Sequence, residues 1–390
     1  EIGVRLVGSE MCIRDRNKTN GKERICAMRI GILTYHRSHN CGALLQAYAL
    51  REFLKLKGYN DVTYVDYWPE YHKDVYRLFR KLYFRKQSLL GKFKFLICLC
   101  VFFRKMVKHK KPFKEFIDRY IEPNTMTDAC YDVVLYGSDQ IWRFQNYPGA
   151  NGYNSVYFGS QEIKANCRIA YSASMGIIKG SEELRCFLTD ALSNFSFIGV
   201  REKDLYDYIK PLVTCPLQHT IDPVFLLSKG EWLKIIPPNI IGRKYILMLH
   251  WQKEAELLPY SAKKASEEKG VELIEIYGFR HSSVICGPLQ FLSLIFHAEC
   301  VFSSSFHGVA FSIIFNTPFY THLRFNQGRV ISILEAFGLK KRFINSVNEI
   351  TVNEQPDWQD VNQKISMWRD SSVSFLLSSL EHYYKNLSER

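Results

Sequence analysis

Four short polar segments each follow an apolar stretch, and their residue types suit anion binding and proton transfer. His307 follows the serine run 303–305 at the predicted start of a helix. A helix N-terminus favours negative charge there, and an imidazole can hold or release a proton near neutral pH. Arg201 directly follows the apolar segment 195–200, where a guanidinium can bind a carboxylate or phosphate through two hydrogen bonds. A structural histidine and a solvated arginine are the alternatives.

The other two segments carry glycine beside polar side chains. In residues 35–42, Gly42 permits close backbone approach, and the helix that starts there offers unpaired N–H groups to an anion. In residues 137–142, Asp139 and Gln140 could bind sugar hydroxyls, with Asp139 as a base. The alternatives are a scaffolding turn in the first segment and, in the second, a helix cap made by Ser138 or Asp139.

The elements that must position these residues alternate between short apolar strands and amphipathic helices, which is typical of a parallel sheet covered by helices. We expect strands at 28–35, 62–67, 131–136, 167–172 and 195–200, and a helix at 43–57 that ends at Gly58. Residues 211–223 read as loop, and 226–238 as a linker.

A second α/β half follows the linker. We expect strands at 244–250, 271–277, 300–304 and 318–322 and helices at 261–269, 288–297, 306–315 and 329–337. The predicted fold class is therefore α/β with two Rossmann-like domains, at 28–225 and 240–390, that face a cleft at the carboxyl ends of their strands.

The net charge of +13 is concentrated in one stretch. Residues 75–114 contain thirteen lysines and arginines and no Asp or Glu, interleaved with the apolar runs 89–90 and 95–103. We expect a basic helical insertion at 75–115. A local basic block favours an anionic membrane surface over nucleic acid, and the alternative is an insertion that covers the first sheet with a solvated basic face.

The remaining composition argues for a reduced protein without a structural metal. The eleven cysteines form no C-x-x-C pair, the histidines lack ligand spacing, and the longest apolar run is too short to cross a bilayer. Residues 1–27 are expected to be a non-native or disordered extension, because VGSEMCIRDR at 7–16 looks like a translated sequencing adaptor and Met28 immediately precedes the first strand.

Seven sequence blocks, in order, resemble the polysaccharide pyruvyl transferase family. They are NCGALLQAYAL (40–50), YDVVLYGSDQIW (131–142), IAYSASMG (169–176), VREKD (200–204), IDPVFLL (221–227), SSFHGVAFSIIFNTPF (304–319) and GRVISILEAFGL (328–339). The resemblance implies a glycosyltransferase-B-like arrangement and transfer of a pyruvyl group from phosphoenolpyruvate, as co-substrate and without a further cofactor, to a sugar of a cell-surface or exopolysaccharide precursor.

The resemblance also assigns residues. Arg201 matches a family arginine that binds the donor, while Phe306 and His307 match the end of an arginine–apolar–histidine triplet whose arginine is replaced by Ser305. Arg329, Arg324 or the helix-start amides around His307 are expected to compensate for that arginine. The implied catalytic set is His307, Arg201 and Asp139, the donor set adds Ser305, Phe306 and Arg329, and the substrate set comprises Asn40, Gly42, Gln46, Gly137, Ser138, Asp139 and Gln140.

Two other function classes remain open. A nucleotide-sugar-dependent glycosyltransferase would need a carboxylate for the donor ribose, around Glu335. A non-catalytic glycan- or membrane-binding relative would fit the loss of the triplet arginine and the basic block. In each case we expect a cytoplasmic location, with the basic block as the route to peripheral contact with the inner face of the membrane, an oligosaccharide or lipid-linked glycan as partner, and no nucleic acid.

Overall fold

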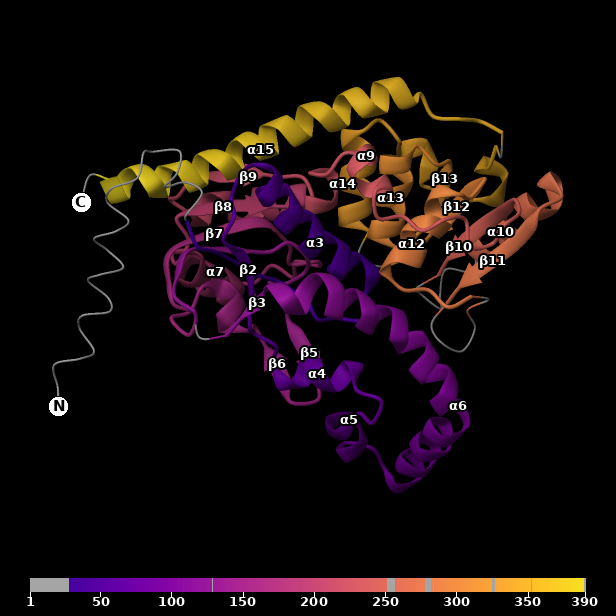
Figure 1. The fold of residues 1–390 in the computed structure, drawn as a ribbon, viewed down its shortest axis with the longest axis horizontal. Coiled ribbons are helices and arrows are strands. Elements are labelled where there is room, and N and C mark those ends of the chain that lie inside the picture. Colours follow the sequence, from indigo (N-terminus) through magenta and orange to yellow (C-terminus); the bar gives the residue numbers. More distant parts are fainter. Residues whose placement is uncertain are drawn as a thin grey trace.

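A computed structural model describes residues 28–127, 129–250, 257–277, 282, 284–324, 327–351 and 353–388. The expected extension 1–27 lies outside the described residues. The two halves of the chain form two parallel sheets, each covered by helices (Figure 1). The chain therefore forms two Rossmann-like α/β domains, as expected.

The first sheet has seven parallel strands in the order β3-β2-β1-β4-β7-β8-β9. Chain order reverses between β1 and β4, which makes a crevice at the carboxyl ends of those two strands. The strands are β1 Ile30–Leu33, β2 Val62–Val65, β3 Thr125–Met126, β4 Tyr131–Tyr136, β7 Ala165–Ala173, β8 Phe197–Val200 and β9 Leu217–His219.

The helices of this domain start where their sequences place caps. Helix α3 (Cys41–Leu56) begins after Asn40, whose side chain accepts a hydrogen bond from the backbone N–H of Ala43. Its buried apolar side packs in one core with the inner faces of β1, β2 and β4. The remaining elements are α7 Glu182–Leu192, α8 Lys203–Ile209 and the hairpin β5 Gln145–Tyr147 and β6 Ala150–Gly152.

The second sheet has four parallel strands in the order β11-β10-β12-β13, and its order reverses between β10 and β12. Its strands are β10 Tyr245–Leu249, β11 Glu272–Ile276, β12 Cys300–Ser303 and β13 Phe319–Thr321, and its helices are α10 Leu257–Lys269, α12 Pro288–Phe296, α13 Phe306–Phe315 and α14 Gly328–Ala336. Helix α13 is buried along its whole length, so its all-round apolar sequence follows from its position between layers.

Two segments differ from the expected layout. The short strand β9 lies in the stretch expected to be loop, and helix α9 (Lys229–Leu233) lies inside the expected linker, held by a capping box between Ser228 and Glu231. Both are too short to carry a periodic pattern, so turn-rich composition hid them.

The closing helix α15 (Trp358–Ser388) belongs spatially to both domains (Figure 1). Its residues were expected to complete the second domain, but the helix crosses back to the first sheet. There the Ser372 hydroxyl accepts a hydrogen bond from the backbone N–H of Ile221, and the Trp368 indole donates to the carbonyl of His219. Helix α15 therefore does not belong to the second domain alone, as was expected, but joins the two domains.

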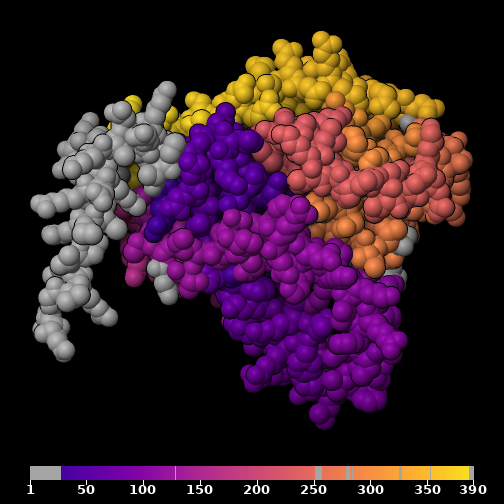
Figure 2. Space-filling model, in the orientation of Figure 1, coloured from indigo at the N-terminus to yellow at the C-terminus, as the bar shows by residue number. Residues whose placement is uncertain are grey.

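The basic insertion is helical, as expected, but it forms an arm rather than a cover for the sheet. It comprises α4 Glu70–Tyr76, α5 Lys81–Arg85 and α6 Leu89–Phe116. Of the 28 residues of α6, Phe113 and Phe116 alone are buried, and both lie at its C-terminal end. The rest of α6 extends away from the two sheets together with α5, and forms the lower lobe in Figures 1 and 2. No helix of the described chain is long and apolar enough to cross a membrane.

Candidate active site

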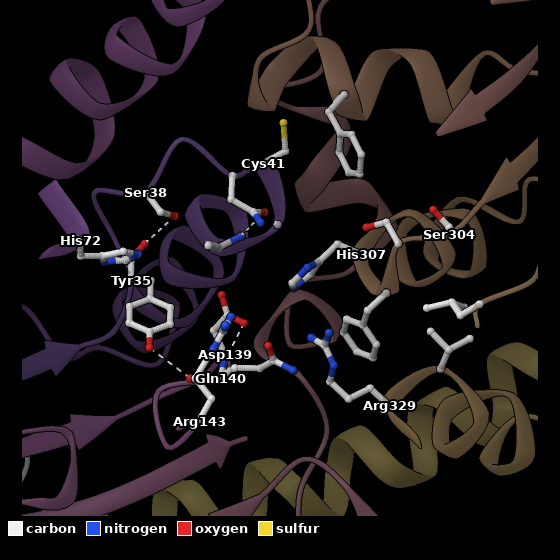
Figure 3. Close-up of a pocket in the computed structure, with 18 of the residues that line it drawn as sticks. Tyr35, Ser38, Cys41, His72, Asp139, Gln140, Arg143, Ser304, His307 and Arg329 are labelled. Atoms are coloured by element: carbon white, nitrogen blue, oxygen red, sulfur yellow. Dashed lines mark hydrogen bonds between the residues drawn. The ribbon is translucent and has the colours of Figure 1, made fainter. Parts of the chain in front are cut away.

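A cavity of about 340 Å³ lies between the two domains, at the crevices of both sheets. Figure 3 shows side chains of the first domain facing those of the second across it. The first domain contributes Tyr35, Ser38, Asn40, Cys41, Gly42, Ala43, His72, Tyr76, Asp139, Gln140, Arg143 and Tyr147, and the second contributes Phe291, Ser304, Ser305, Phe306, His307, Leu323, Arg329 and Val330. The strand-end segments of the two predicted domains therefore meet in one place.

Three helices begin at this cavity. The first residues of α3, α13 and α14 line it, and these helices are 16, 10 and 9 residues long. Asn40 caps α3, and Ser305 caps α13 through a 3.4 Å hydrogen bond from the N–H of Gly308. The exposed N–H groups and the dipoles of helix N-termini attract anions, so the cavity is prepared for negative charge.

His307 packs directly on the start of α3. A methyl group added at Gly42 would lie 1.9 Å from Nδ1 of His307, so the ring occupies the space that any other side chain at position 42 would need. The Nε2 atom is 3.8 Å from the carboxylate of Asp222, too far for a hydrogen bond, and has no hydrogen-bond partner among the described residues. Because Gly42 has no side chain, it leaves the space that the ring of His307, from the other domain, occupies.

Burial lowers the pKa of His307 to about 4, an effect only partly offset by the carboxylates of Asp222 and Asp139. The imidazole is therefore neutral near pH 7. An anion bound beside it would favour the protonated form and raise this pKa.

Arg329 brings a positive charge to the cavity wall, and its side chain is half-buried. Its guanidinium lies 5.6 Å from the centre of the Phe306 ring, and its Nε atom has no hydrogen-bond partner in the described part of the chain. Burial, and then the neighbouring charge of Arg201, lower its pKa to about 10, so the group stays protonated at neutral pH. A buried N–H donor without a partner is costly unless a ligand accepts its hydrogen bond.

Arg201 lies behind this wall, and its side chain is 1% exposed. Its Nη1 donates to Asp222 at 2.7 Å, its Nε lies 3.4 Å from Glu202, and its Nη2 lies 3.9 Å from Asp139. The guanidinium also stacks 4.8 Å from the Phe306 ring. Three carboxylates therefore hold Arg201 where it supports Phe306 and Asp222, outside the group of residues that line the cavity.

Asp139 is the acidic group on the cavity wall. Burial alone would raise its pKa, but the charges of Arg201, His307 and Arg329 outweigh burial and the pKa is lowered. Its Oδ1 accepts the backbone N–H of Gln140 at 2.8 Å. The backbone at Asp139 has φ of 72°, in the left-handed region that asparagine and aspartate tolerate better than most residues. Asp139 is thus a carboxylate at neutral pH, able to accept a proton.

The loop after β4 is held in place by three other predicted site residues that lie behind the cavity wall. Gln46 accepts the N–H of Ser138 at 3.2 Å and donates to the Thr34 hydroxyl at 2.8 Å, while the Ser138 hydroxyl donates to Asp222 at 3.3 Å. Gly137 lies against the carbonyl of Tyr171, where a methyl group would be 2.4 Å from that oxygen. These three residues position Asp139 and do not line the cavity themselves.

The predicted residues thus divide into two sets. The structure brings together at the cavity wall Asn40, Gly42, Asp139, Gln140, Ser305, Phe306, His307 and Arg329. It places the other four, which are Gln46, Gly137, Ser138 and Arg201, in the shell behind that wall.

Asp222 was missed as a site residue. It is buried, it pairs with Arg201, and it is the carboxylate nearest to Nε2 of His307. A signal was present, because an aspartate followed by a proline is typical of a helix start, and Asp222 caps the short helix that begins at Pro223. The expected loop at 211–223 concealed the strand β9 that brings it to the carboxyl edge of the sheet.

An aromatic wall on the first-domain side was also missed. Tyr35 and His72 lie with ring centres 4.7 Å apart, His72 and Tyr76 5.3 Å apart, and Tyr147 stacks on Tyr71 at 5.6 Å. Arg143 reaches the same wall above Tyr147. His72 and Tyr76 come from α4 and Tyr147 from the small hairpin, whose places in the fold no strand-end pattern indicates. Tyr35 follows β1, in the segment 35–42 that the sequence singled out.

The remaining expected and alternative features lie elsewhere. Glu335, the carboxylate that a nucleotide-sugar site would use, pairs with Lys340 at 2.7 Å and does not line the cavity. No group of three or more His, Cys, Asp or Glu side chains that could hold a metal ion occurs within the described ranges.

Comparison with solved structures gives low sequence identity throughout. UDP-N-acetylglucosamine 2-epimerase from Rickettsia bellii is 12% identical, with 93% of this chain and 100% of that chain covered and a TM-score of 0.45. The heptosyltransferase WaaC from E. coli with ADP is 11% identical, with 87% and 99% covered and a TM-score of 0.36. A functionally uncharacterised protein from Klebsiella pneumoniae is 12% identical, with 61% and 85% covered and a TM-score of 0.37.

Sequence comparison is more specific. No curated protein matches the chain. The family model described as polysaccharide pyruvyl transferase matches residues 40–321, a span that begins at the cap of α3 and ends with β13. It includes His307 and Asp139, whereas β1 and Arg329 lie outside the span. The chain belongs to the polysaccharide pyruvyl transferase family and is a transferase.

Proposed function

We propose that this transferase moves the pyruvyl group of phosphoenolpyruvate onto a sugar of a cell-surface or exopolysaccharide precursor, as a ketal. The observation that carries this proposal is the guanidinium of Arg329, whose buried Nε has no hydrogen-bond partner among the described residues, in a cavity where three helices begin. A small donor with both a phosphate and a carboxylate would use such a set of N–H groups.

Arg329 takes the place of the family arginine that Ser305 replaces. Arg329 and Arg201 lie 5.6 and 4.8 Å from the centre of the same Phe306 ring, and Arg329 alone of the two lines the cavity. In this proposal Arg329 and the start of α13 bind the phosphate, and the start of α3 binds the carboxylate. Arg201 is a positioning residue that acts through Phe306 and Asp222.

The acceptor sugar occupies the side of the cavity bounded by the aromatic wall. Tyr35, Tyr76 and Tyr147 offer ring faces and hydroxyls, and Gln140 and Asp139 offer polar groups for sugar hydroxyls. Asp139 lies between this side and the cations of the donor side, so its carboxylate can take the proton of an attacking hydroxyl.

The reaction balances with these groups alone. A proton is added to C3 of the donor, which becomes a methyl group and leaves C2 electrophilic. One sugar hydroxyl adds to C2 and loses its proton, the C2–O bond to phosphate breaks, and a second hydroxyl closes the ketal and loses its proton. Of the two protons released, one replaces the proton used at C3 and the other leaves with the phosphate or solvent.

His307 is the proposed proton donor. It is neutral in the free protein because burial lowers its pKa. The negative charge of the bound donor raises that pKa, so donor binding itself charges the imidazole and makes it an acid. Positioned acid–base groups contribute about 10²- to 10⁴-fold to rate.

The experiment is phosphate release from phosphoenolpyruvate in the presence of candidate oligosaccharide acceptors, with mass spectrometry of the product. The proposal predicts phosphate release that depends on acceptor and a product heavier by one pyruvyl ketal. Transfer of a sugar from a nucleotide sugar, with no phosphate release from phosphoenolpyruvate, would contradict it.

A further inference from the structure

The arm formed by α5 and α6 exposes an unusual amount of apolar surface. Seventeen large hydrophobic side chains are exposed in the described chain, and nine of them lie between positions 79 and 107. On α6 alone the exposed fractions reach 86% for Leu89, 62% for Phe93 and 68% for Val101. Single exposed hydrophobics are ordinary, but a contiguous patch marks an interaction site.

The arm is held together by its other side. Phe95 of α6 packs against Phe79, Phe84 and Tyr83, with ring centres 5.6 to 6.0 Å apart. Phe79 is itself one of the nine exposed hydrophobics, whereas the exposed residues of α6 take no part in these ring contacts.

One stripe of exposed residues along α6 changes from apolar to basic, and the exposed side chains of Leu90, Leu96, Phe103 and Val107 lie on or beside it. Positions 89, 93, 97, 101, 104, 108 and 111 are spaced by three or four residues, so they lie on one face, and all are exposed. The first four are Leu, Phe, Ile and Val, and the last three are Arg, Lys and Lys. We call these seven residues the arm stripe.

The charge of the arm is of one sign. Residues 75–114 contain thirteen basic residues and no acidic residue. Within the described residues no ion pair involves Lys94, Arg104 or Lys108, and Lys111 pairs only with Glu115 at the end of the helix. The basic part of the stripe is thus available to an anionic partner.

We propose that the arm stripe docks this protein on a bilayer containing anionic lipid. The apolar residues enter the boundary between headgroups and acyl chains, and the basic residues bind the headgroup phosphates, as in amphipathic helices that lie in a membrane interface. A second copy of the chain would bring two basic arms together, which like charge opposes. A nucleic acid would neutralise the basic residues but leave the apolar ones in water.

The arm is also joined to the active site. His72 and Tyr76 of α4 line the catalytic cavity, and Tyr76 also lines a second cavity of about 200 Å³ with His39, Lys110 and Phe113. A docked arm would suit an acceptor sugar attached to a lipid. That last point rests on the proposed function, whereas the docking itself does not.

The test is flotation of the full chain with vesicles of phosphatidylcholine alone or mixed with phosphatidylglycerol. Binding is expected to the mixed vesicles only and to weaken with salt, since surface charges are screened. In Arg104→Gln/Lys108→Gln, the loss of about 1 kcal/mol per basic residue predicts about 30-fold weaker binding. The triple variant Leu89→Ser/Phe93→Ser/Ile97→Ser is expected to bind the mixed vesicles at least about tenfold more weakly than the wild type does.

The matched control is Ile240→Ser/Tyr260→Ser/Met367→Ser, which removes three exposed hydrophobics outside the arm and should bind as the wild type does. Circular dichroism and activity on a water-soluble acceptor should be unchanged in every variant, which separates this test from the fate of the proposed function. Absence of binding to mixed vesicles, equal binding by the arm variants, or concentration-dependent self-association in place of vesicle binding would each overturn the proposal.

Discussion

At the residue scale, the contact between Gly42 and His307 joins the two domains at the site. A methyl group at position 42 would be 1.9 Å from Nδ1 of the imidazole, so Gly42→Ala must displace the ring. We expect the rate of pyruvyl transfer to fall by about 10²-fold or more, the size of a lost acid–base group, with the thermal midpoint of unfolding little changed.

Gly180→Ala is the matched control for this substitution. Its added methyl group would meet only Tyr208, at an ordinary 3.5 Å. Turnover and thermal denaturation measured side by side should show full activity for Gly180→Ala. Equal activity in both variants would show that the position of His307 does not matter.

Donor binding should take up a proton at His307. The imidazole is neutral when the cavity is empty, because its pKa is lowered to about 4, and a bound anion raises this value. Affinity for phosphoenolpyruvate should therefore strengthen as the pH falls from about 7.5 to about 5.5, with a slope of at most about tenfold per pH unit.

His307→Gln separates this effect from ionisation of the donor phosphate, whose own pKa is about 6. Titration calorimetry in buffers of different ionisation enthalpy should show less proton uptake for the variant. Identical proton uptake in the two proteins would remove the role given to His307.

Residue types at strand ends predicted the site because parallel strands share one carboxyl edge. Because of this shared edge, we expected Asp139, His307 and Gly42 to lie together, and all three line the cavity. The same reasoning cannot find cavity residues that do not follow a strand. Arg201 shows a second limit. Its position after β8 is as expected, but two of the three carboxylates around it, Asp139 and Asp222, follow other strands and could not be foreseen from the segment that holds Arg201 and Glu202.

At the element scale, α15 fixes the relation between the domains. Leu376 is fully buried in the core shared with the first sheet, whereas Met367 on the same helix is 67% exposed. Leu376→Ala should reduce the free energy of unfolding by about 2–5 kcal/mol, the usual cost of a large-to-small change in a core, and Met367→Ala by much less. Urea denaturation of both variants tests this, and equal midpoints would show that α15 does not stabilise the fold.

The periodic elements were predictable, and the connections were not. Helix α3 and strands β1, β4 and β12 carry strong apolar patterns and formed where expected within a few residues. The return of α15 across the molecule depends on contacts such as that between Ser372 and Ile221, 151 positions apart, which no local pattern encodes.

At the scale of the whole molecule, buried histidines should make the fold acid-sensitive. Burial lowers the pKa of His36 to about 3 and those of His72 and His307 to about 4. The unfolded chain takes up protons below about pH 6.5 while the folded chain does not, so stability is lost as the pH falls from there toward about 4. Each histidine should lower the free energy of unfolding by about 2 kcal/mol between about pH 7 and about pH 5.

His36→Phe isolates one of these contributions away from the cavity wall. The ring of His36 stacks on Tyr64, and its Nε2 has no partner in the described chain. A phenyl ring keeps the stacking but loses the 3.0 Å hydrogen bond from Nδ1 to the carbonyl of Thr34, so the test compares the change of stability with pH and not its absolute value. Denaturation across this pH range should give a shallower loss of stability for the variant. A free energy of unfolding that does not change with pH would contradict the account.

The most direct test of the central claim, that Arg329 binds the anionic donor, is calorimetric titration of phosphoenolpyruvate into the wild-type protein, Arg329→Gln and the control Arg243→Gln. Arg243 is an exposed arginine in the second domain, paired with Glu272. The account predicts binding to the wild type and to Arg243→Gln, and binding to Arg329→Gln that is weaker by about 10- to 100-fold, as expected for loss of a charged hydrogen-bonding group. Unchanged affinity in Arg329→Gln, or no binding of phosphoenolpyruvate to the wild type, would contradict it.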